Sequence, residues 1–137
     1  MSLEPLLTEL TDGRPYVRAE LIRLWLEEHK TEDAPVGSPD GNWVFGIFFD
    51  LSHERPEEAW SVIQELMTHN LTAWQVVMLA AGPMEDLLAT HGELFIERVE
   101  AAARSDPKFR HLLGGVWQST ATDAVWQRVV RCRDAAW

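Results

Sequence analysis

Three proline-led segments with apolar residues at helical spacing constrain the fold of this chain more than any other feature. Proline is favoured in the first turn of a helix, and an aspartate just before it is a common N-cap. After Asp106-Pro107, four apolar residues recur at i, i+3, i+4 and i+7, as on one helix face: Phe109, Leu112, Leu113 and Val116. Pro56 and Pro83 begin comparable segments. The second half of the chain is therefore predicted to be helical.

Two apolar segments decide the class of the fold. Residues 72–81 carry no charge, which indicates a helix surrounded by other helices. Residues 43–51 suit either a buried strand or a buried helix, and the lack of a partner strand elsewhere favours the helix. Gly82-Pro83 should end the central helix, and Gly92 should end the following one after His91.

We predict one all-α domain over residues 1–137, an irregular bundle of seven to eight helices whose neighbours run antiparallel. The other expected helices cover 3–10 (weakly), 15–30 and 56–70, with a last one from about 120. Residues 31–42 hold two prolines and two glycines without apolar periodicity, which predicts a surface loop. Because Pro56, Pro83 and Pro107 recur at intervals shorter than common helical repeats, a short α-solenoid-like array is only the alternative.

Charge narrows the classes of partner. The 137 residues carry a net charge of −10, and residues 101–137 hold six basic and three acidic groups, which leaves −13 on the first 100 residues. This balance disfavours nucleic acid and anionic membranes and would attract a basic protein, although acidic surfaces often serve only solubility. No apolar run is long enough to span a bilayer. A single cysteine and no signal-peptide pattern predict a cytoplasmic protein.

The stretch from Ala80 to Gln118 resembles the core of a bacterial family of unknown function. Members of that family share, in order, Gly-Pro-Leu-Glu-Asp-Leu-Leu, His-Gly, Phe-Ile, Asp-Pro-x-Phe-Arg and Val-Trp, and this chain departs only in having Met84 where leucine is usual. A looser likeness covers residues 56–131. The resemblance implies no established activity, cofactor or site residue.

Glu85, Asp86 and His91 are the polar side chains of this stretch that suit acid–base chemistry, and they are our candidate catalytic residues for a hydrolase-like enzyme. Structural roles compete with this interpretation. Free N–H groups at a helix start favour adjacent carboxylates, and a histidine in a last turn satisfies terminal carbonyls. We predict no metal site, because His91 and Glu93 are two residues apart and do not share a helix face.

Arg110 is a candidate binding residue. It stands four residues after Asp106, within reach across one helical turn, and a different packing would bring it to Glu85 and Asp86. A structural ion pair with one of these carboxylates is the competing interpretation.

Seven tryptophans are many for a chain of this length. Tryptophan is over-represented on binding surfaces, so Trp25 and Trp43, together with Trp137, are candidate contact residues. The other four lie on apolar faces and are expected in the core: Trp60, Trp74, Trp117 and Trp126.

The sequence lacks the motifs of common hydrolases, phosphate-binding loops and paired-cysteine sites. We therefore expect no cofactor. The leading hypothesis is a non-catalytic acidic module that binds another protein, with an accessory or toxin-neutralising role. The alternatives are a small-molecule-binding domain that uses the tryptophans and Arg110, and the hydrolase-like enzyme described above.

Overall fold

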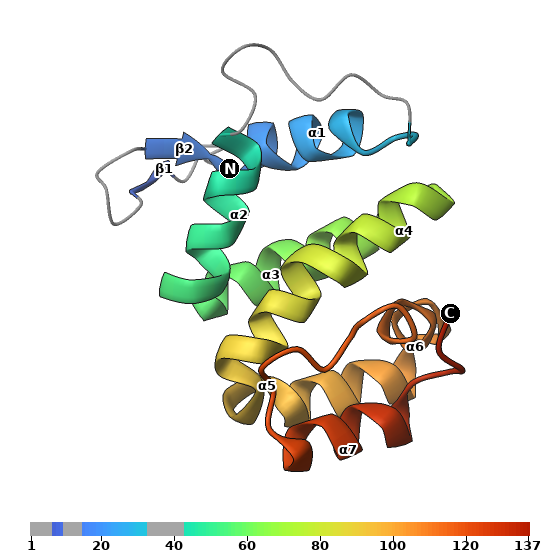
Figure 1. The fold of residues 1–137 in the computed structure, drawn as a ribbon. Helices are drawn as coiled ribbons and strands as arrows, with labels where there is room; N and C mark the ends of the chain where they lie inside the picture. The colour runs from blue at the N-terminus through green and yellow to red at the C-terminus, as the bar shows by residue number, and fades with distance from the viewer. Residues whose placement is uncertain (1–6, 10–14, 33–42) are drawn as a thin grey trace.

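A helical segment from Ala73 to Ser105, called the rod below, runs through the middle of the structure and bends sharply at His91 within α5 (Figure 1). The computed structural model describes residues 7–9, 15–32 and 43–137. The rod consists of α4 (Ala73–Leu79), a π-helical turn η1 (Ala80–Met84) and α5 (Glu85–Ser105). The other elements are β1 (Leu7–Glu9), β2 (Pro15–Val17), α1 (Arg18–Glu28), α2 (Trp43–Glu54), α3 (Pro56–Met67), α6 (Pro107–Leu113) and α7 (Asp123–Cys132).

The remaining helices pack around the rod and share one apolar core with it. In Figure 1, α1 and α2 lie on one side of the rod and α6 and α7 on the other, while α3 runs alongside. Fully buried side chains from both sides belong to a single cluster, among them Leu21, Leu51, Ile63, Phe95 and Phe109. Burying this much apolar surface is what offsets the conformational entropy lost by a chain of this length.

Pro83 lies inside the rod instead of starting a new helix. A proline has no N–H, and its ring clashes with the carbonyl group four residues earlier, which ends or kinks most helices. Here the turn widens, and the N–H of Glu85 bonds to the carbonyl oxygen of Ala80, five residues earlier. The predicted break at Gly82-Pro83 is therefore wrong, because one wider turn accommodates the proline and the helix continues.

The predicted helix end at His91 and Gly92 is a kink within α5. His91 has φ −134° and ψ 28°, which are not helical values, yet the helix resumes directly after it. Gly92 is buried, and a Cβ atom built there would lie 2.8 Å from Cγ1 of Val125 in α7. The glycine therefore permits the close approach of α5 and α7 directly after the kink.

The all-α class is confirmed, and the predicted number of helices is slightly too high. If the rod is counted once, the described residues form six separate helices. Helix α2 confirms the helical interpretation of the apolar run 43–51.

The N-terminal predictions need correction. Strands β1 and β2 pair antiparallel, with Leu7 opposite Val17, so residues 7–9 are not helical and α1 begins at Arg18. The rest of the expected helix over 3–10 lies outside the described residues, as does most of the expected loop at 31–42.

A capping box ties the start of α4 to the end of α1. The side chain of Thr72 accepts a hydrogen bond from the N–H of Gln75, and Oε1 of Gln75 accepts one from the N–H of Thr72 at 2.8 Å. Nε2 of Gln75 donates to the carbonyl oxygen of Leu26 at 2.7 Å, and Oγ1 of Thr72 donates to that of Lys30 at 2.8 Å. These bonds hold the last turn of α1 over the N-terminal end of the rod.

We predict that Gln75→Leu lowers the free energy of unfolding by about 2 kcal/mol, because it leaves the carbonyl of Leu26 and the N–H of Thr72 without partners in a partly buried place. The measurement is urea unfolding followed by circular dichroism. Gln64→Leu is the matched control, since Nε2 of Gln64 is buried without a partner and its loss should cost little. Equal destabilisation by both substitutions would contradict the prediction.

Candidate functional site

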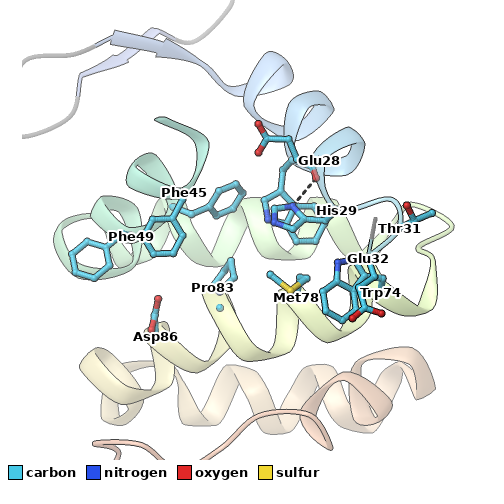
Figure 2. Close-up of a pocket in the computed structure, with 13 residues that line it drawn as sticks. Glu28, His29, Thr31, Glu32, Phe45, Phe49, Trp74, Met78, Pro83 and Asp86 are labelled. Atoms are coloured by element: carbon cyan, nitrogen blue, oxygen red, sulfur yellow. Dashed lines mark hydrogen bonds between the residues drawn. The ribbon is translucent and has the colours of Figure 1, made fainter. Parts of the chain in front are cut away.

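A pocket opens between the rod, α1 and α2 (Figure 2). Its volume is about 320 Å³, which falls in the range of small-molecule sites. Pro83 and Met78 form its floor on the rod. Five aromatic side chains line it: Trp25 from α1, Phe45, Phe48 and Phe49 from α2, and Trp74 from α4. The surface that a ligand would meet here is therefore mainly apolar and aromatic.

The charged groups of this pocket are acidic. Glu28, Glu32 and Asp86 line it together with His29 and Thr31, and no lysine or arginine belongs to the lining within the described residues. Figure 2 shows Asp86 and Glu32 at opposite ends of the pocket and Glu28 along the edge formed by α1. Negative charge is thus distributed around aromatic rings, whose faces are also electron-rich.

The carboxylate of Asp86 has no evident structural role among the described residues. Burial raises the pKa of its carboxyl group above the ordinary value, and the nearby charge of His53 opposes this shift. Within the described part of the chain, its carboxylate has no hydrogen bond or ion pair. The free N–H groups expected at a helix start are also absent, because the rod continues through this point. Burial likewise raises the pKa of Glu28, against the opposing charge of His29.

The three candidate catalytic residues contact different parts of the fold. Oε1 of Glu85 accepts a hydrogen bond from the N–H of Trp117 at 2.9 Å. Nε2 of His91 lies 2.9 Å from the carbonyl oxygen of His53, to which it donates. Only Asp86 of the three lines the pocket. Glu85 therefore hydrogen-bonds the segment that follows α6, and His91 connects the kink of α5 to the end of α2 by a hydrogen bond.

Arg110 lies away from the pocket and has a structural role. Its Nη1 donates to the carbonyl oxygen of Ala103 at 2.7 Å, and its Nε lies 3.7 Å from Oδ1 of Asp134. The N–H of Asp134 donates back to the carbonyl oxygen of Arg110 at 3.2 Å. The expected pairing with Asp106 or with Glu85 and Asp86 is wrong, because Asp106 caps α6 through the N–H of Lys108.

The C-terminal segment closes over two glycines. Nε1 of Trp137 donates to the carbonyl oxygen of His111 at 2.8 Å, and its ring stacks on the imidazole of that residue. A Cβ atom at Gly114 or Gly115 would overlap the Trp137 ring, so the indole can lie there only because both residues lack side chains. Trp137 is 45 % exposed.

The tryptophans divide between pocket and core differently from the prediction. Trp25 is only 3 % exposed, and its indole packs on Phe48 and His29 in the pocket wall. The side chain of Trp43 lies outside the described residues. Trp74 lines the pocket, and Trp117 is 75 % exposed, so its expected place in the core is wrong.

Sequence reasoning missed the contribution of α2 to the pocket. Phe45 and Phe49 are 70 % and 47 % exposed, although the whole run 43–51 was expected to be buried. A signal was present: the two residues are four apart and therefore share a helix face, separate from the face that holds Val44 and Phe48. Among the described residues, no neighbouring helix covers this second apolar face of α2 completely.

The described residues also bear on metal binding and on membrane crossing. Their histidine, cysteine, aspartate and glutamate side chains form no group of three or more that would hold a metal ion. None of their helices combines the length and the apolar character needed to cross a bilayer.

Most of the chain matches a known protein family. The model of a family of unknown function, DUF6869, matches residues 30–137. This chain belongs to the DUF6869 family. The matched region begins further toward the N-terminus than the resemblance at 56–131, and it includes α2 and the rod, which form two sides of the pocket. Trp25, Glu28 and His29, on the third side, precede it. The curated proteins and the solved structures gave no match to this DUF6869 member.

We predict that Asp86→Asn makes the protein more stable at neutral pH, by about 0.5 kcal/mol after allowance for solvent screening. The raised pKa of Asp86 means that the folded state binds more protons than the unfolded state over the interval between the two pKa values. Stability therefore falls as pH rises through that interval, and asparagine removes this loss. Thermal unfolding at several pH values measures it, and the gain should vanish below the ordinary aspartate range.

Glu100→Gln is the control for this prediction. The hydrogen-bonded guanidinium of Arg128 lowers the pKa of Glu100, so its ionised form stabilises the fold and its removal should destabilise the protein at neutral pH. A stability gain of the same size in both variants would contradict a specific cost at Asp86.

Proposed function

We propose that this DUF6869 protein is a non-catalytic binding module whose pocket takes an organic cation with an apolar body. One observation carries the proposal: a pocket of about 320 Å³ with five aromatic side chains and three carboxylates has no lysine or arginine in its described lining. Aromatic faces attract cations by about 0.5 to 2 kcal/mol each, more strongly where water is excluded. Carboxylates beside them add charge complementarity.

The arrangement favours binding over acid–base chemistry. Glu85 and His91, two of the three candidate catalytic residues, are engaged with the backbone of Trp117 and His53. A shared proton transfer needs groups within direct hydrogen-bond reach of one substrate atom. The hydrolase-like alternative therefore has no favouring observation, whereas Asp86 suits the role of a counter-ion for a bound cation.

A basic protein segment is the second candidate ligand. Phe45 and Phe49 stack with ring centroids 6.4 Å apart, and Phe49 stacks on His53 at 4.1 Å. Exposed aromatic side chains next to an acidic pocket favour a partner with apolar and basic side chains. This candidate retains the accessory or toxin-neutralising role expected from the charge of −13 on the first 100 residues.

Filling the pocket tests the proposal. Gly82 lines the pocket, and a Cβ atom added there meets nothing within 4 Å, so Gly82→Leu should place its side chain in the pocket without disturbing the fold. We predict that the protein binds benzyltrimethylammonium and that Gly82→Leu weakens this binding at least about tenfold, which is about 1.4 kcal/mol. Isothermal titration calorimetry measures the affinity, and Gly82→Ala is the matched control.

Benzyl alcohol and phenylacetate serve as the neutral and anionic probes. Each should bind more weakly than the cation, because the three carboxylates offer it no favourable charge. Binding of all three probes with equal affinity, or an unchanged affinity of the cation for Gly82→Leu, would overturn the proposal.

The second candidate has its own test. An amphipathic peptide of lysine and leucine, labelled for fluorescence anisotropy, should lose affinity about tenfold when Phe45 and Phe49 are both replaced by serine. Leu94→Ser is the control, since Leu94 is equally an exposed apolar side chain, at 56 %, but does not line this pocket. An equal loss in the control would show that the peptide binds without regard to this surface.

A further inference from the structure

We propose that the ligand of this pocket is a linear aliphatic polyamine, a triamine or tetraamine that lies lengthwise along the rod. This inference rests on the proposed function and names the class of cation. The positions of the charged groups support it. The carboxylates lie at the two ends of the pocket and along one edge, while the middle of the pocket floor is apolar (Figure 2).

The length of the pocket excludes a compact cation as its best occupant. Figure 2 shows Glu32 beside Trp74 at one end and Asp86 at the other. Trp74 and Asp86 are twelve residues apart on one continuous helical rod, which corresponds to about 18 Å along the axis. A small ammonium ion reaches one of these carboxylates and leaves the other unpaired. A long chain with an amine at each end pairs both.

The chemistry between the two ends matches the spacers of a polyamine. Pro83 and Met78 present apolar surface to the middle of the ligand, and the rings of Phe45 and Phe49 lie on the α2 side of the pocket. Methylene groups gain from contact with such surfaces, and ammonium groups gain from the ring faces. Glu28, on the α1 edge, is placed for an internal amine. The methylene spacers of a polyamine would therefore contact the apolar side chains of the pocket, and its ammonium groups would contact the carboxylates.

In the free protein, the carboxylate of Asp86 is available as a counter-ion for a bound cation. This carboxylate has no hydrogen bond or ion pair within the described residues, and the nearby charge of His53 only opposes the effect of burial, so a bound ammonium group would add a direct counter-charge. No arginine or lysine of the described lining competes for it. Binding therefore breaks no existing ion pair at this position.

A homologous series of ligands tests the inference. Isothermal titration calorimetry compares butylamine, 1,4-diaminobutane, a linear triamine with three- and four-carbon spacers, and the corresponding tetraamine. We expect affinity to rise at least about tenfold from the diamine to the tetraamine. Asp86→Asn and Glu32→Gln should each reduce tetraamine affinity by about fivefold and leave that of butylamine within about twofold, since a single amine needs only one end.

Controls separate the site from attraction to an acidic protein in general. Glu93→Gln removes the same charge outside this pocket and should leave tetraamine affinity unchanged, and Gly82→Leu should abolish the gain with ligand length. Equal losses in Glu93→Gln and Asp86→Asn, or tetraamine binding that survives Gly82→Leu, would overturn the inference.

The two proposals fail in different ways. If benzyltrimethylammonium binds in the pocket and the tetraamine binds no more tightly than butylamine, the polyamine inference is overturned while the proposed function stands. If no cation binds the wild-type protein more tightly than its neutral analogue, both are overturned.

Discussion

The structure depends on burying a helix with no charged residue between Ala73 and Met84. Such a helix gains most when other helices cover it, and Leu79, Ala80 and Met84 are fully buried. The chain supplies α2 and α3 toward one part of this surface and α6 toward another. Because the rod is longer than the helices that cover it, some of its length stays open, and the pocket forms where α1 and α2 do not close over Met78 and Pro83.

The pocket also shows how binding capacity and stability oppose each other in a small protein. Asp86 and Glu28 are carboxylates whose ionised forms burial disfavours, and both line the same pocket. Two carboxylates elsewhere show the opposite effect, because an ion pair lowers the pKa of each: Glu57 pairs with Arg98, and Glu100 with Arg128. An ionised group that costs stability and has no partner in the free protein is a common feature of ligand sites.

Periodicity and caps predicted much of the fold but little of the pocket. The helix after Pro107, its Asp106 cap and the helical state of 43–51 follow from local spacing. The error at Gly82-Pro83 has a physical cause, because this pair ends most isolated helices but is accommodated here by a wider turn. The rod therefore stays helical across Pro83, whereas the helix end predicted at His91 and Gly92 coincides with the kink in α5. Of the predicted site residues, Asp86 and Trp25 line the pocket. The pairing of Arg110 with Asp134 and the exposure of Phe45 depend on contacts between distant segments, which local spacing does not contain.

The π-helical turn changes how the sequence of the rod must be drawn on a helical wheel. Its extra residue rotates everything after Met84 by about 100° relative to a regular helix. A wheel drawn without this rotation would therefore place Asp86 on the wrong face. Deleting one residue between Ala80 and Met84 would restore regular spacing and turn both Asp86 and Glu85 away from their present neighbours. Among related sequences, a one-residue gap at this point would therefore separate chains with this pocket from chains that only share the fold.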